Sequence, residues 1–219
     1  MKAPTLLVNK LHAPVTVLGP GRRLGIWLQG CRIRCKGCVS QDTWAFDTQR
    51  AMPVADLLAW CRSTVESAAE PITGITLSGG EPFDQAPGLL ALLKGLRQHP
   101  RTAELDILCY SGYPLKTLEA NHAKILQHLD ALIPEPYIDA LPMEKRWRGS
   151  ANQTLQCLTP RAQARYAADL DAPAEKAMQI SLSGQQIWFI GLPARGDMPR
   201  LEALCRERGI DFSSVSWRR

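Results

Sequence analysis

The chain has 219 residues, of which 45% are apolar and 21% are charged. This is the composition of a globular protein, and it excludes intrinsic disorder. The net charge of +5 is small, and no long basic run is interleaved with aromatic residues, so a nucleic-acid partner is not expected. No apolar run reaches the roughly 18 residues of a transmembrane helix. Lys10 and His12 interrupt the N-terminal segment before a signal-peptide core can form. We therefore expect a cytoplasmic protein without a membrane partner.

Strand-like and helix-like segments alternate along most of the chain, which predicts an α/β fold with a parallel sheet. The predicted strands are rich in apolar residues and span 23–29, 72–77, 104–110 and 131–138. The predicted helices carry apolar residues at helical spacing and span 54–69, 89–96 and 118–129.

From about residue 142 this alternation stops. A polar segment at 144–153 is followed by predicted helices at 159–169 and 198–208. Between these helices, apolar runs at 178–183 and 186–190 flank Gly184 and predict a β-hairpin that forms an antiparallel edge. We expect residues 1–141 to form the core and residues 142–219 to be a C-terminal elaboration of the same domain.

The seven cysteines are expected to be thiols, because no signal peptide points to an oxidising compartment. Four are scattered and are expected to be small buried apolar residues: Cys61, Cys109, Cys157 and Cys205. The other three, Cys31, Cys35 and Cys38, form a C-x-x-x-C-x-x-C cluster directly after the first predicted strand.

Three thiolates in one short loop can surround a small metal centre. Structural zinc takes four ligands, and no fourth Cys or His lies nearby in the sequence. A four-iron cluster held by three cysteines keeps one iron open to a further ligand, so this spacing points to chemistry at that iron. The alternatives are a zinc site completed from elsewhere in the chain and plain buried thiols.

The cysteine spacing resembles that of the radical S-adenosylmethionine (AdoMet) enzymes. A second segment, Ser78-Gly79-Gly80-Glu81-Pro82, is similar to the GGEP motif of that family, which binds the methionine amino group. Glycines let a backbone approach a ligand closely, and a carboxylate can accept a hydrogen bond from an ammonium group. The resemblance implies an incomplete parallel β/α barrel and one [4Fe-4S] cluster on Cys31, Cys35 and Cys38. It also implies AdoMet contacts at Gly79, Gly80, Glu81 and Pro82.

Within that family the chain resembles the activating enzymes of anaerobic ribonucleotide reductase and their relatives, over roughly residues 10–155. The resemblance rests on the segments GPGRRLGIWLQGC, KGC, TLSGGEPFDQ, YSGY and RWRGSANQ. Gly37 takes the place of the aromatic residue that many family members have before the third cysteine. It is expected with Val39 among the AdoMet contacts. Ser111 resembles a position near the AdoMet ribose, with a simple turn residue as the alternative.

The family resemblance implies a function as well. Reductive cleavage of AdoMet would give a 5′-deoxyadenosyl radical that abstracts a hydrogen atom from a glycine of a partner glycyl-radical enzyme. The alternatives are a radical AdoMet enzyme that modifies a small molecule or a peptide, and a non-catalytic zinc or iron–sulfur module. The chain is longer than the short activases and has Ile133-Pro134-Glu135-Pro136 where they often carry Asp-Gly-Pro, which leaves the partner open.

Two further segments lead to hypotheses about contacts with partners. No acid lies between Lys10 and Asp42, and five cations do: Arg22, Arg23, Arg32, Arg34 and Lys36. This stretch is predicted to dock an acidic electron donor such as a flavodoxin, with a solvated loop or an AdoMet carboxylate contact as alternatives.

The second segment lies in the polar stretch after residue 142. It is expected to shape the open side of the barrel and to contact the partner through Arg148, Gly149, Ser150, Asn152 and Gln153. Packing of Arg146 and Trp147 at the edge of the core is the alternative.

Overall fold

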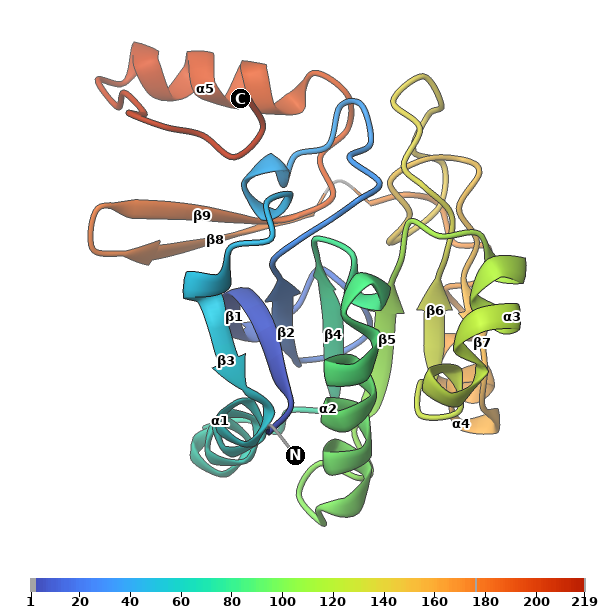
Figure 1. Cartoon of the computed structure of the whole chain (residues 1–219). Helices are drawn as coiled ribbons and strands as arrows, with labels where there is room; N and C mark the ends of the chain where they lie inside the picture. Colours follow the sequence, from blue (N-terminus) through green and yellow to red (C-terminus); the bar gives the residue numbers. More distant parts are fainter. Residues whose placement is uncertain (1–2, 176, 219) are drawn as a thin grey trace.

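A seven-stranded sheet in the order β3-β1-β2-β4-β5-β6-β7 forms the centre of the computed structural model, which describes residues 3–175 and 177–218 (Figure 1). Four strands are parallel: β2 (Arg23–Leu28), β4 (Gly74–Gly79), β5 (Asp106–Tyr110) and β6 (Ala131–Ile133). The flanking strands are antiparallel: β1 (Thr5–Val15) and β3 (Ala51–Pro53) on one side and β7 (Gln156–Cys157) on the other.

Three helices connect the strands and share one hydrophobic core with them: α1 (Val54–Ser67), α2 (Ala86–Gln98) and α3 (Leu115–Leu126). Their apolar positions, such as Leu57, Leu92 and Leu118, are fully buried in this core. Because β2, β4, β5 and β6 run parallel, their carboxyl ends lie at one edge of the sheet (Figure 1). That edge is where α/β folds bind ligands.

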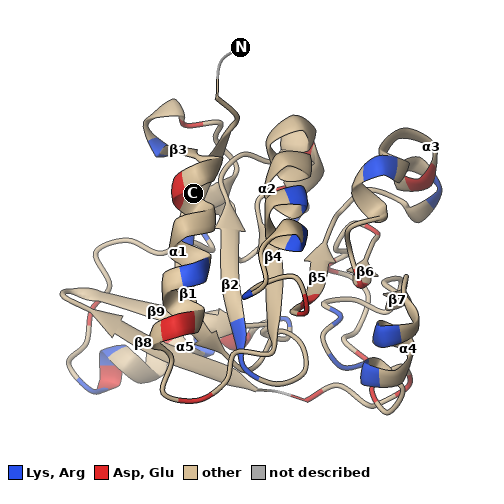
Figure 2. Cartoon of the chain, turned by 90° about the horizontal axis from the view of Figure 1, so that it is seen from below, with Lys and Arg blue, Asp and Glu red and all other residues tan. Residues whose placement is uncertain are grey.

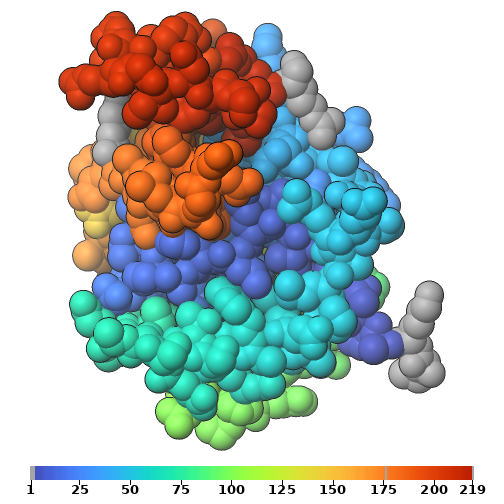
Figure 3. Space-filling view, turned by 90° about the vertical axis from the view of Figure 1, so that its left-hand side faces the viewer, coloured from blue at the N-terminus to red at the C-terminus, as the bar shows by residue number. Residues whose placement is uncertain are grey.

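Two elements after β7 pack against residues of the other face: α4 (Pro160–Tyr166) and the hairpin of β8 (Met178–Ser183) and β9 (Gln186–Gly191). The last helix is α5 (Asp197–Glu207). Tyr166 of α4 packs with Leu108 of β5. The Trp188 ring of the hairpin lies 4.9 Å from the Trp27 ring of β2. In Figure 3 the hairpin (orange) lies beside the N-terminal strands (blue), and the C-terminal segment with α5 (red) lies above the hairpin. The C-terminal segments are therefore part of the packed molecule.

The predicted α/β class and mostly parallel sheet are confirmed, with two differences. The strand predicted at 131–138 ends at Ile133, because Pro134 and Pro136 have no N–H for the ladder. The hairpin forms a two-stranded sheet of its own, so it is not the antiparallel edge of the main sheet. The partial barrel and the boundary near residue 142 stay predictions. No helix among the described residues has the length and hydropathy to cross a membrane.

Candidate functional site

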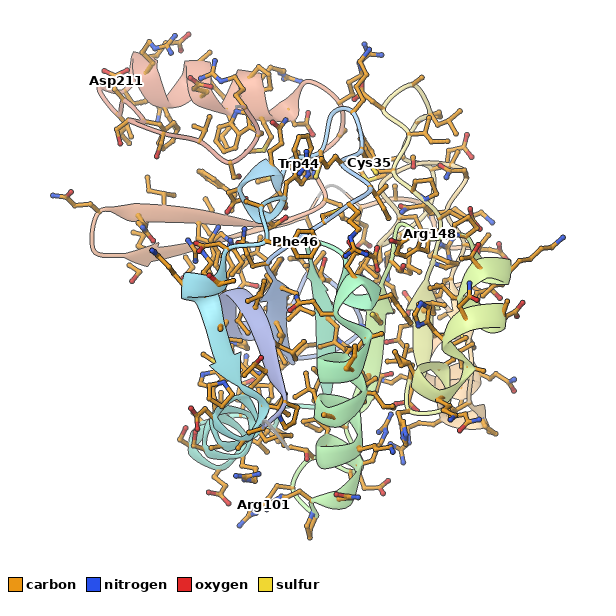
Figure 4. All side chains as sticks on the ribbon, in the orientation of Figure 1. Cys35, Trp44, Phe46, Arg101, Arg148 and Asp211 are labelled. Carbon is orange, nitrogen blue, oxygen red and sulfur yellow. The ribbon has the colours of Figure 1, made fainter. Side chains whose placement is uncertain are left out.

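The cysteine loop and the GGEP turn meet at the carboxyl ends of β2 and β4. The Gly80 N–H donates to the Leu28 carbonyl at 2.8 Å, and the Glu81 N–H donates to the Gly30 carbonyl at 2.8 Å. The segments that follow β2 and β4 therefore stay hydrogen-bonded to each other beyond the strands. This pairing brings Cys31 beside Glu81. Figure 4 shows Cys35, Trp44 and Phe46 at this end of the sheet and Arg101 at the opposite end. Two motifs about 50 residues apart in the sequence form one site.

The two glycines of the GGEP turn are required by the neighbouring backbone. Gly79 has φ +102°, and a Cβ there would lie 2.5 Å from the Leu28 amide nitrogen. A Cβ on Gly80 would overlap the Gly30 carbonyl. Close approach to a ligand was the expected reason for these glycines. The structure shows that contact between the two loop backbones already demands them.

Glu81 ties the ends of β4 and β5 together. Its side chain is 1% exposed and accepts hydrogen bonds from the Phe83 amide (2.9 Å), the Ser111 hydroxyl (2.9 Å) and the Gly112 amide (2.7 Å). Burial raises the pKa of Glu81 to about 7. A carboxylate offers about four acceptor positions, so one remains for a further donor. Pro82, also buried, begins the short 3₁₀ helix η3 (Pro82–Gln85) that Glu81 caps.

Ser111 has a supporting role in this structure. It is 4% exposed, its hydroxyl donates to Glu81, and the same hydroxyl accepts from the Tyr113 amide at 3.1 Å. Both contacts belong to the turn after β5. These contacts are those of a turn residue, and the AdoMet ribose contact expected of Ser111 stays a prediction.

N–H donors of the cysteine loop itself point at two of the three sulfurs. Hydrogen bonds from the backbone N–H groups of Ile33 and Arg34 lower the pKa of the Cys31 thiol. The Ser40 amide donates to the Cys38 sulfur at 3.4 Å. Such donors stabilise negative charge on sulfur, which is the state that a thiolate ligand needs.

Two donors come from outside the triplet. A hydrogen bond from the Trp44 side chain lowers the pKa of the Cys38 thiol, and a hydrogen bond from the Tyr137 backbone N–H lowers the pKa of the Cys35 thiol. Trp44 also contacts the first cysteine, because its carbonyl accepts from the Cys31 amide at 3.1 Å. The sequence analysis assigned neither residue to the site. For Trp44, the only local signal in the sequence is the Thr-Trp pair in the segment SQDTWAF. Tyr137 contributes only its backbone to the site.

Burial opposes the negative charge that the hydrogen bonds to the sulfurs favour. Burial raises the pKa of Cys31 to about 11 and raises the pKa of Cys35 and of Cys38. The charges of Glu81 and Cys38 raise the Cys31 pKa further, so the three thiols and Glu81 are close enough to interact. Within residues 3–175 and 177–218 no three His, Cys, Asp or Glu side chains are arranged around a single metal ion. In a [4Fe-4S] cluster each cysteine binds a different iron.

Asp84 of η3 is a further site residue that the sequence did not reveal. It accepts hydrogen bonds from the Arg32 amide (2.8 Å) and the Tyr113 hydroxyl (2.7 Å). Its side chain is 1% exposed, and the Arg32 guanidinium lies 3.9 Å away. Asp84 therefore fastens the cysteine loop to the GGEP turn.

Gly37 and Val39 contact other segments of the chain. Gly37 has φ +79°, and a Cβ there would lie 2.5 Å from the Asp139 carboxylate. The Val39 carbonyl accepts from the Ser216 hydroxyl at 2.8 Å. The cysteine loop is therefore held between the loop after β6 and the C-terminal tail, and the AdoMet contacts expected of Gly37 and Val39 stay predictions.

The prediction that five cations form one surface patch is wrong for two of them. Arg23 is fully buried and pairs with Asp106 at 2.6 Å, and Arg22 pairs with Glu70 at 3.3 Å. Both residues lie at the start of β2, whereas the cysteine loop follows the other end of this strand. The length of the strand therefore separates them from the loop. Arg32, Arg34 and Lys36 are exposed on the cysteine loop itself. Charges of both signs are spread over the helices in Figure 2.

Two residues of the segment 146–153 are buried, which contradicts direct partner contact through them. Arg148 is 3% exposed and Ser150 is fully buried. Trp147 packs against Tyr166 at a ring distance of 5.7 Å, as the packing alternative predicts. Among the scattered cysteines, Cys61 and Cys109 are buried as expected, whereas Cys157 and Cys205 are half-exposed.

Comparison with known proteins agrees with this geometry. The family described as "4Fe-4S single cluster domain" matches residues 17–156, well over half of the chain, so the chain belongs to that family of iron–sulfur proteins. It is similar to the anaerobic ribonucleoside-triphosphate reductase-activating proteins of Vibrio cholerae (30% identity over 154 residues, 68% of this chain and 96% of the relative) and of Escherichia coli K12 (28% over 151 residues, 67% and 96%). The phage T4 protein of the same name is 29% identical over 149 residues, 64% of this chain and 86% of the relative.

The chain is therefore an activase-like radical AdoMet enzyme with a [4Fe-4S] cluster and AdoMet as its cofactors.

Proposed function

We propose that this enzyme activates an anaerobic ribonucleoside-triphosphate reductase by removing a hydrogen atom from a glycine of that partner. The observation that carries the proposal is the junction of the two motifs, where the Glu81 N–H bonds to the carbonyl of Gly30 directly before Cys31. The names of the relatives supply the class of partner. We assign residues 1–141 and 142–219 to one domain, because α4 and the hairpin pack against the sheet.

In this proposal Cys31, Cys35 and Cys38 hold three irons of the cluster, and the fourth is left for AdoMet. When bound, the cluster and AdoMet would supply the one-electron reduction and the hydrogen-atom abstraction. The chain's own residues position and shield these groups. Gly79, Gly80 and Pro82 shape the turn beside the cysteine loop, and Glu81 keeps one acceptor position for the AdoMet ammonium group. Its burial keeps water from that carboxylate.

The electron enters, we propose, at the exposed tip of the cysteine loop. Arg32 is held by Asp84 and lies over the Phe46 ring, whereas Arg34 and Lys36 make no ion pair with the described residues. An acidic donor such as a flavodoxin complements these charges, because opposite charge speeds association.

The proposal is tested with anaerobically purified protein and its cysteine variants. The wild type should carry about four irons, cleave AdoMet when reduced, and generate a glycyl radical, seen by electron paramagnetic resonance, in a co-purified reductase. Replacing Cys31, Cys35 or Cys38 by Ala should abolish all three, while Cys61→Ala and Cys157→Ala should keep the iron.

Iron loss in the two control variants, with the triplet variants intact, would refute the ligand assignment. AdoMet cleavage without a radical on the reductase would favour a small-molecule or peptide substrate. A colourless zinc protein would favour the non-catalytic module.

A further inference from the structure

The loop after β6, residues 134–139, reaches the cysteine loop at two points. The Asp139 carboxylate lies against Gly37, and the Tyr137 backbone N–H lowers the pKa of the Cys35 thiol through a hydrogen bond. Among the described residues, Tyr137 supplies the backbone N–H that reaches the cysteine triplet from a distant part of the sequence. The position of this loop therefore decides whether Cys35 receives its hydrogen bond.

The loop cannot hold that position by regular secondary structure. It follows the last residue of β6, it contains Pro134 and Pro136, which have no N–H to donate, and Glu135 has φ +82°. Backbone groups that leave a strand still need partners when they are partly buried.

Side chains of the segment 150–153 supply those partners. The Gln153 amide donates to the Glu135 carbonyl (2.9 Å), and the Asn152 amide donates to the Pro136 carbonyl (2.8 Å). The Ser150 hydroxyl accepts from the Ile138 amide at 3.1 Å. We call Ser150, Asn152 and Gln153 the brace. Its side chains bind the backbone at 135, 136 and 138, on both sides of Tyr137.

The brace is itself fixed in orientation. The Ser150 hydroxyl donates to the Asn152 Oδ1 at 2.7 Å, which turns the Asn152 amide toward Pro136. The Gln153 Oε1 accepts from the Gly149 amide at 2.8 Å, which turns its NH₂ toward Glu135. Ser150 is fully buried, so water does not compete for its hydroxyl.

We infer that the brace consists of positioning residues, which hold the Tyr137 amide on Cys35 and thereby raise the reduction potential of the cluster. The inference rests on the proposed function, because it takes Cys35 as a cluster ligand. Hydrogen bonds to cluster sulfurs are among the factors that set the potential. An N–H donor stabilises the more negative, reduced state, so loss of this bond should make the one-electron reduction harder.

The first test needs no cluster. Hydrogen–deuterium exchange is measured on metal-free Ser150→Ala, Asn152→Ala and Gln153→Ala, with Gln156→Ala as the matched control, since the Gln156 amide donates to the nearby Thr154 hydroxyl. We expect the Tyr137 and Ile138 amides to exchange about tenfold faster in the brace variants and at the wild-type rate in the control. Wild-type exchange at Tyr137 in all three brace variants would overturn the inference.

The second test is a redox titration of the iron-loaded proteins. At a fixed solution potential we expect a reduced-to-oxidised ratio about threefold to tenfold lower in the brace variants than in Gln156→Ala. An unchanged ratio, with the exchange at Tyr137 accelerated, would show that the brace orders the loop but does not tune the cluster, and would overturn the inference. If Ser150→Ala does not fold, the same test is made with Asn152→Ala and Gln153→Ala, because these two positions are less buried. A wild type that binds no cluster would instead refute the proposed function.

Discussion

At the scale of single residues, the Trp44 side chain lies outside the triplet and lowers the pKa of the Cys38 thiol through a hydrogen bond. Trp44→Phe keeps the ring but removes the indole N–H that bonds to Cys38. We expect unchanged iron content and a reduced-to-oxidised cluster ratio about threefold lower at a fixed potential, because the reduced state loses a donor. Redox titration measures this ratio. Trp60→Phe, on α1, is the matched control, and equal ratios in the two variants would contradict the role of Trp44.

Glu81 predicts a pH dependence at the same scale. Its pKa is about 7 in the folded chain, above the value of 4.5 for the free side chain, because it is buried. Its stabilising contribution is therefore complete below about pH 4.5 and is lost as the pH rises through about 7. Relative to Glu81→Gln, the metal-free wild type should lose about 3 kcal/mol of unfolding free energy between pH 4.5 and 8. Urea unfolding of both proteins measures the difference. A pH-independent difference would contradict the raised pKa.

At the scale of elements, one buried ion pair joins β2, β4, β5 and α4. The Arg23 guanidinium bonds to Asp106 at 2.6 Å and to Thr76 at 2.7 Å, and the Tyr166 hydroxyl donates to Asp106 at 2.7 Å. Asp106→Asn leaves the buried guanidinium without a counter-charge, so we expect a loss of about 3–5 kcal/mol in unfolding free energy. The matched control is Glu104→Gln, in the exposed pair with Arg161, which should cost less than about 1 kcal/mol. Equal losses in urea unfolding would contradict the central role of the pair.

At the scale of the whole molecule, the C-terminal tail closes one side of the cysteine loop. The Gln41 amide donates to the Ser216 carbonyl at 2.8 Å, and the Gln41 side chain donates to the Trp217 carbonyl at 3.0 Å. Removing residues 214–219 should speed the release of iron to a chelator by about threefold or more, because the loop then opens more often. Removing residues 218–219 alone is the control. Equal release rates in the two truncated proteins would show that the tail does not protect the cluster.

The other prediction at the scale of the whole molecule concerns the exposed charges of the cysteine loop. Arg34→Glu with Lys36→Glu should slow reduction by an acidic protein donor about tenfold at low salt and should weaken its salt dependence. Reduction by dithionite, which needs no docking surface, should change much less. Arg22→Glu with Arg62→Glu, away from the cysteine loop, is the control. A parallel fall in both reduction rates would mean that these cations serve the cluster or AdoMet directly.

The sequence by itself determined the chemistry and most of the elements. The cysteine spacing and the GGEP turn are local patterns, and apolar periodicity is local too, so β2, β4, α1 and α2 were predictable within a few residues. The proline pair after Ile133 could have indicated the early end of β6.

Only the tertiary structure decided which distant groups meet. Arg23 looked like part of a basic surface patch and is a buried ion-pair partner, because its environment comes from β5 and α4. The Tyr137 amide and Asp84 reach the cysteine loop, and the brace reaches the loop after β6, through contacts between residues that are up to about a hundred positions apart. No local pattern encodes such contacts. Local sequence sets propensity and donor chemistry, whereas partners, burial and charge pairing arise when the chain packs.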